Sequence, residues 1–110
     1  MITEEQADES INFLMVKSSE YGKAMSEVAY IENALKRVKA QGMSDSDKKT
    51  LGDREMDAYL TDEYMTMLQG YRAAVHAKEE LKWQMESHKM RFEKWRTEQF
   101  NMRTEAKLAT

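Results

Sequence analysis

The chain has 110 residues, the size of one domain, and it contains no proline, no cysteine and only four glycines. Its formal net charge of -3 implies no general attraction to nucleic acid or anionic lipid, and the absence of cysteine excludes a disulfide scaffold and a cysteine-ligated zinc site. Because proline and glycine both disfavour helix interiors, this composition predicts an all-α protein built from long helices.

The first predicted helix covers residues 3–41. Thr3 is a suitable N-cap, and Glu4 and Glu5 fall in the first turn, where the helix dipole favours negative charge. Seam positions then recur at alternating steps of three and four residues, the period of helices that wind around a partner. This first seam consists of Leu14, Lys17, Tyr21, Ala24, Val28, Ile31, Leu35 and Val38. Gly42 is predicted to follow the helix as its terminating residue.

Residues 42–53 form the predicted connector, because they are mostly small and polar and contain two glycines. Either Ser44 with Asp47 or Thr50 with Asp53 is spaced to cap the helix that follows. The sequence leaves both alternatives open.

The second long helix is predicted over residues 54–106, with a break or a kink near Thr61. Its seam consists of Leu60, Tyr64, Met67, Tyr71, Ala74, Lys78, Leu81, Met85, His88, Phe92, Trp95, Gln99 and Met102. A short connector makes two such helices antiparallel neighbours. We therefore expect residues 1–110 to form a single coiled-coil-like helical hairpin.

The two predicted helices differ in length, so the longer one should end in an unpaired segment. This segment is expected near four large apolar residues: Phe92, Trp95, Phe100 and Met102. A group of exposed apolar side chains of this size is expected to be covered by another molecule. The sequence therefore predicts a homodimer or higher oligomer, a helical bundle whose interface contains these four residues.

Charge is unevenly distributed: residues 1–70 carry 8 Lys/Arg and 14 Asp/Glu, whereas residues 71–110 carry 9 Lys/Arg and 6 Asp/Glu. Aromatic rings next to basic side chains suit single-stranded nucleic acid, whose bases stack while phosphates meet Lys and Arg. The candidate residues for nucleic-acid or partner contact are Lys82, Trp83, Lys89, Arg96 and Arg103. Alternatively, these basic side chains are neutralised within the helix. Three glutamates each lie three residues before a lysine or arginine on a solvated flank and could pair with it: Glu79, Glu86 and Glu93.

Three residues lie off the seam on the second helix and indicate another contact face. Trp83 is either exposed or at a second interface, and Met65 and Met90 are candidates for the same role. Methionine adapts its shape to different partners, which suits it to such a face.

No motif for chemistry stands out. His76 and His88 are twelve residues apart without a clear ligand pair, and Asp45, Asp47 and Asp53 do not match a calcium-binding loop. The chain has no glycine-rich phosphate loop, nucleophile elbow or zincin helix. We expect a protein that is not an enzyme and has no metal site and no cofactor.

Two stretches resemble small all-helical proteins of tailed bacteriophages that are encoded among genes for DNA recombination and early functions. The first reads Thr50-x-x-x-Arg54-Glu55-x-x-Ala58-x-x-Thr61-x-x-Tyr64, and the second reads Phe92-x-x-Trp95-Arg96, followed by Asn101 and Arg103. The resemblance covers residues 50–103. It implies an accessory protein that acts on DNA-processing machinery, without catalytic residues. The positions that it marks for testing are Arg54, Tyr64, Trp95, Arg96 and Arg103.

The leading hypothesis is a phage-type accessory protein that binds recombination or replication machinery or single-stranded DNA through the C-terminal half of its second helix. The alternatives are an inhibitor or adaptor that docks on a host nuclease or defence complex, and a structural virion or scaffold component. The chain has no apolar run of about 18 residues and begins with an acidic segment, unlike a signal peptide. We therefore expect a cytoplasmic protein, in the host cytoplasm if it is phage-encoded, with no membrane partner.

Overall fold

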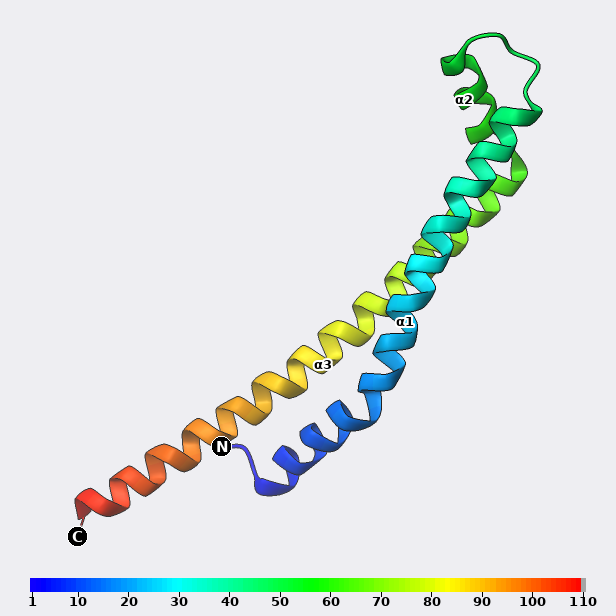
Figure 1. Cartoon of the computed structure of the whole chain (residues 1–110). Coiled ribbons are helices and arrows are strands. Elements are labelled where there is room, and N and C mark those ends of the chain that lie inside the picture. The colour runs from blue at the N-terminus through cyan, green and yellow to red at the C-terminus, as the bar shows by residue number, and fades with distance from the viewer. Residues whose placement is uncertain (110) are drawn as a thin grey trace. The chain divides into compact units, whose positions relative to one another are not determined.

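The computed structural model describes residues 1–109 and confirms the all-α helical hairpin (Figure 1). It contains three helices: α1 (Glu4–Asp45), α2 (Leu51–Tyr59) and α3 (Asp62–Ala109). The chain divides into two compact units. The first unit contains residues 1–21, which include the beginning of α1, and residues 80–109 of α3. The second unit spans residues 22–79 and includes α2.

The burial of side chains confirms both predicted seams. Every residue of the first seam is buried or half-buried, and so is every residue of the second seam from Tyr64 to Gln99, whereas Leu60 and Met102 at its ends are exposed. The first seam also continues further than predicted, because Ser10 and Ala7 extend the same steps and are fully buried. A period of 3.5 residues keeps one stripe of each helix facing its neighbour.

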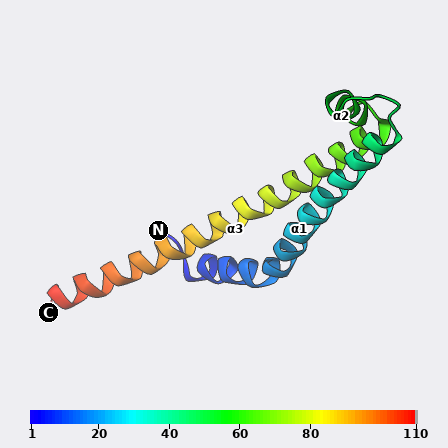
Figure 2. The same ribbon diagram turned by 45° about the horizontal axis from the view of Figure 1, so that its top comes forward.

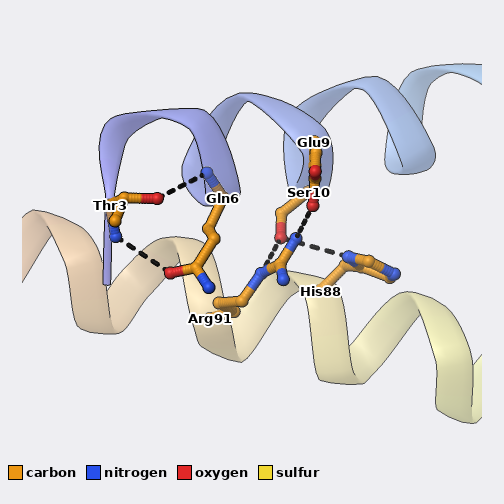
Figure 3. A network of polar contacts seen from close by, with 6 residues as sticks. All are labelled: Thr3, Gln6, Glu9, Ser10, His88 and Arg91. Atoms are coloured by element: carbon orange, nitrogen blue, oxygen red, sulfur yellow. Dashed lines mark hydrogen bonds and ion pairs between the residues drawn. The ribbon is translucent and has the colours of Figure 1, made fainter. Parts of the chain in front are cut away.

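A capping box starts α1. The backbone N–H of Gln6 donates to Thr3 Oγ1 over 3.1 Å, and the N–H of Thr3 donates to Gln6 Oε1 over 2.9 Å (Figure 3). These bonds satisfy backbone donors that have no partner inside the first turn. The prediction of Thr3 as the N-cap is confirmed.

The predicted end of the first helix at residue 41 is wrong, because α1 continues through Gly42 to Asp45. No glycine among the described residues has a positive φ, so Gly42 does not make a left-handed terminating turn. A Cβ atom built on Gly42 would lie 2.9 Å from both Cα and Cβ of Ala58 in α2. Gly42 is therefore a helix-interior residue whose missing side chain lets α2 approach α1.

The predicted connector is too long, since only residues 46–50 separate α1 from α2. Thr50 Oγ1 accepts a hydrogen bond from the N–H of Asp53 over 3.2 Å and caps α2, whereas Ser44 lies inside α1. Of the two capping alternatives, the structure contains the one with Thr50.

The predicted helix over residues 54–106 is two helices in the structure, separated at Leu60 and Thr61. Thr61 Oγ1 donates to the Ala58 carbonyl over 2.9 Å and accepts from the N–H of Tyr64 over 3.2 Å. Of the break or kink expected near Thr61, the structure contains the break, and Thr61 caps the start of α3.

Polar contacts hold α2 against the last turns of α1, and both views show the two helices side by side (Figures 1 and 2). Lys39 Nζ lies 2.9 Å from Glu55 Oε1, which also accepts from the hydroxyl of Tyr59 over 2.8 Å. Contacts with Tyr59 and Glu55 raise the pKa of Lys39, and contacts with Lys39 and Tyr59 lower the pKa of Glu55. This cluster fixes α2 on α1 at neutral pH.

The Lys39–Glu55 contact should weaken in acid. Because the pKa of Glu55 is lowered from 4.5, its contribution to stability is fully present above pH 4.5 and is lost as the pH falls through the folded-state pKa. The raised pKa of Lys39 means that its contribution is present at every pH below 10.5. The difference in urea unfolding between the wild type and Glu55→Gln should therefore be smaller at pH 3 than at pH 7. A gap between the two that is equally wide at both pH values would contradict this.

Candidate partner and nucleic-acid interface

A polar network crosses the seam of the first unit (Figure 3). Arg91 Nε donates to Ser10 Oγ over 2.7 Å, Ser10 Oγ lies 3.1 Å from His88 Nδ1, and Arg91 Nη2 lies 3.3 Å from Glu9 Oε2. Because a guanidinium can only donate, Ser10 accepts from Arg91, and its hydroxyl proton remains available to His88. Each of these contacts joins the first turns of α1 to α3.

This network contains a serine hydrogen-bonded to a histidine, but its geometry does not suit catalysis. Ser10 is fully buried, so a substrate does not reach its Oγ atom, which also accepts a hydrogen bond from Arg91. The ring of Phe13 stacks on that of His88 with centroids 4.1 Å apart. A polar layer of this kind on the seam sets the register of paired helices.

Ser10 is the residue that sequence reasoning missed in this network. The available signal was its position, since steps of four and three back from Leu14 reach Ser10 and then Ala7. The predicted seam begins at Leu14 because that is its first large apolar residue, and it leaves out the small residues before it, Ser10 and Ala7.

The four predicted interface residues divide into two pairs. Phe92 and Trp95 are half-buried on the seam, with ring centroids 5.9 Å apart, whereas Phe100 and Met102 are exposed. The N–H of Ile2 donates to Glu98 Oε2 over 3.0 Å, so the beginning of the chain reaches that far along α3. The expectation that the unpaired end includes Phe92 and Trp95 is wrong. The continuous exposed segment is Phe100–Ala109, in which every residue is exposed. The oligomer interface itself stays a prediction.

The candidate contact residues on α3 are all exposed: Lys82, Trp83, Lys89, Arg96 and Arg103. Of these, the structure brings together Lys82 and Trp83, whose Nζ atom and ring centroid are 5.7 Å apart, a cation–π distance. The basic residues are spaced at seven-residue intervals, about 10.5 Å along the helix. They form a continuous stripe and not a cluster.

The glutamates that were alternative partners of this stripe form no ion pair with it at three-residue spacing. Within residues 1–109, no ion pair joins Glu86 to Lys89 or Glu93 to Arg96, and Glu79 contacts Lys78 over 3.5 Å. In the same unit, however, the first turns of α1 are acidic, and Glu9 contacts Arg91. These nearby carboxylates reduce the attraction of the unit for a polyanion.

Residues of the first stretch that carries the phage resemblance have structural roles around α2. Arg54 Nε donates to the Lys48 carbonyl over 2.7 Å, and the rings of Tyr64 and Tyr59 meet edge to face with centroids 5.1 Å apart. Arg54 and Tyr64 therefore stabilise the connection between helices. Arg96 and Arg103, by contrast, have exposed side chains.

The described part of the chain has no group of three or more His, Cys, Asp or Glu side chains arranged to hold a metal ion. A surface hollow of about 450 Å³ is lined by Tyr71, Arg72, Val75, His76 and Glu79, which all belong to α3. A hollow along one helix is not enclosed by a second element, unlike a typical ligand pocket. None of the helices in residues 1–109 is sufficiently long and apolar to span a bilayer.

In comparisons with known proteins, no family model, curated protein or solved structure matches this chain.

Proposed function

We propose that this protein acts by binding, as an oligomeric accessory protein that docks the exposed end of α3 on a protein partner. The observation that supports this proposal is the exposure of every residue from Phe100 to Ala109, including the large apolar side chains of Phe100, Met102 and Leu108. Following the resemblance, we further propose that it is a bacteriophage protein and that the partner belongs to DNA recombination or replication machinery.

One face of this helical end has the composition of a segment that binds in a groove. Phe100, Thr104 and Leu108 recur at four-residue steps, which places them on one side of the helix. The Thr104 hydroxyl donates to the Phe100 carbonyl over 3.0 Å, so it is already satisfied when a partner removes water. Arg103 and Lys107 flank this face. The fitting partner is a protein with an apolar groove bordered by carboxylates.

The test is a pull-down from host lysate with the tagged chain and a double variant. Phe100→Ser with Leu108→Ser should lose a stoichiometric partner that the wild type retains, because central apolar anchors contribute about 2 kcal/mol or more each. The matched control is Leu51→Ser with Met56→Ser, which changes two exposed apolar residues of α2. Equal retention by wild type and the Phe100 variant would refute docking through this end.

The same experiment separates the alternative functions. A host nuclease or a component of a defence complex as the retained partner would favour an inhibitor or adaptor. Large assemblies in light scattering, without a retained partner, would favour a virion or scaffold component.

A second candidate function is contact with single-stranded DNA along the basic stripe of α3. The observation that favours it is the exposure of Lys89 and Arg96 without neutralising glutamates at three-residue spacing. Fluorescence anisotropy with a short labelled single strand should then show salt-sensitive binding. Arg96→Gln with Arg103→Gln should reduce the salt slope by about 1.4, since each single-strand phosphate contact contributes about 0.7. The absence of salt-sensitive binding at micromolar protein would exclude this function.

A further inference from the structure

A stripe on α3 in the first unit faces away from the seam. It recurs at steps of three and four residues and consists of Glu80, Trp83, Ser87, Met90, Lys94 and Thr97, all of them exposed. At 100° per residue, Trp83 and Met90 lie about 140° to 180° around the helix from the seam residues Leu81, Met85 and Phe92. The part of α1 that packs on the seam therefore leaves this outward stripe uncovered.

The outward stripe has the properties of a helix-packing surface. Trp83 is 62% exposed and Met90 is 59% exposed, although both are large and apolar. Between them, the hydroxyl of the small residue Ser87 donates to the Trp83 carbonyl over 2.9 Å. Thr97 likewise donates to the Glu93 carbonyl over 3.1 Å. Hydroxyls already bonded to their own helix are less costly to dehydrate, and a small central side chain admits a neighbouring helix closely.

When two copies of this stripe run in opposite directions, the residues of one complement those of the other. We propose that the outward stripe is the contact between two copies of this chain, packed antiparallel about a two-fold axis at Ser87. In that arrangement Trp83 meets Met90 of the second copy, and Glu80 meets its Lys94, and each of these pairs occurs twice. Sulfur–aromatic contact and opposite charge both favour these pairs.

The charges also select the direction of packing. A parallel arrangement would place Glu80 beside Glu80 of the second copy and Lys94 beside its Lys94, so that both pairs repel. The antiparallel arrangement replaces both repulsions with attractions. Specificity of this kind depends on what the wrong arrangement costs as much as on what the right one gains.

The single chain buries few large apolar side chains, so association with a second copy would add apolar burial. Among residues 1–109, the buried apolar residues are Ala7, Val28, Ala34 and Ala58, three of which have only a methyl side chain. Association would bury Trp83 and Met90, which each chain leaves in water. The inference specifies the oligomer of the proposed function, and it does not use the exposed end at Phe100–Ala109.

Because the chain has no cysteine, single cysteine variants report this contact directly. Ser87→Cys lies on the proposed axis and should form a covalent dimer under mild oxidation. Thr97→Cys lies on the same stripe but ten residues away, about 15 Å along the helix, so its symmetry mate is about 30 Å distant. A disulfide needs Cα atoms within about 7 Å, and Thr97→Cys should therefore stay reduced. Efficient cross-linking of both variants, or of neither, would overturn the proposal.

Sedimentation equilibrium gives an independent readout. Trp83→Ala with Met90→Ala should raise the dimer dissociation constant by about 30-fold, as expected for the loss of central anchors. Met25→Ala, which changes an exposed methionine of α1 in the other unit, is the control and should leave it unchanged. If Phe100→Ser dissociates the oligomer and the Trp83 variant does not, the interface is at the end of α3. That result would overturn this inference and leave the proposed function standing.

Discussion

Replacing Gly42 by alanine should lower the free energy of unfolding by about 1–3 kcal/mol, although alanine is the better helix former. The reason is the backbone of α2. A Cβ atom at residue 42 would lie 2.9 Å from Cα and Cβ of Ala58, and Ala58 is fully buried. No flexible side chain can move aside at this contact, so α2 itself must shift away from α1.

Gly22→Ala is the matched control, because a Cβ atom there would meet nothing within 4 Å. Gly22 is also inside α1, so this variant should raise the free energy of unfolding by about 1 kcal/mol through helix propensity alone. Urea unfolding followed by circular dichroism at 222 nm measures both variants. Equal stabilisation by the two substitutions would show that α2 does not pack on Gly42.

Gly42 also illustrates what periodicity in a sequence can and cannot predict. Both seams follow from spacing alone, and burial confirms them along α1 and α3. The role of Gly42 does not follow in this way, because a glycine after a helical pattern fits a helix end as well as a close helix contact. Only the position of Ala58 in three dimensions distinguishes the two.

The sequence indicates an irregularity near Thr61 but does not distinguish a kink from a break. A chain without proline favours long uninterrupted helices, which led to one helix over residues 54–106. Thr61 interrupts it by using its hydroxyl for the Ala58 carbonyl and for the N–H of Tyr64. Threonine is common inside helices as well as at their ends, so its side-chain bonding competes with the helix only in some contexts.

The placement of Phe92 and Trp95 depended on the register between the helices, which helix lengths alone do not determine. Ile2, just before α1, reaches Glu98, so Phe92 and Trp95 are half-buried, and every residue from Phe100 to Ala109 is exposed. The register is associated with the layer around Ser10. A pattern search that accepts a buried serine would have found that layer, because Ser10 and His88 both occupy seam positions.

Ser10→Ala should lower the free energy of unfolding by about 2 kcal/mol, because it removes the acceptor of a charged donor in a buried layer. Arg91 Nε would lose its partner at 2.7 Å, and His88 Nδ1 would lose its partner at 3.1 Å. Ser19→Ala is the control, since Ser19 is exposed in the same helix and its replacement should change stability by less than about 0.5 kcal/mol. Urea unfolding compares the two variants with the wild type.

A double-mutant cycle with Arg91→Met tests whether this cost comes from the Ser10–Arg91 bond. Once the guanidinium is gone, no half-buried charged donor is left without its acceptor, so Ser10→Ala should cost clearly less in that background than in the wild type. The interaction energy of the pair should therefore reach about 1 kcal/mol or more, as for other directly bonded residues. If the two substitutions lower the free energy of unfolding additively, the cost of Ser10→Ala does not come from its hydrogen bond with Arg91. The register of the first unit would then depend on the seam's apolar residues and not on this polar layer.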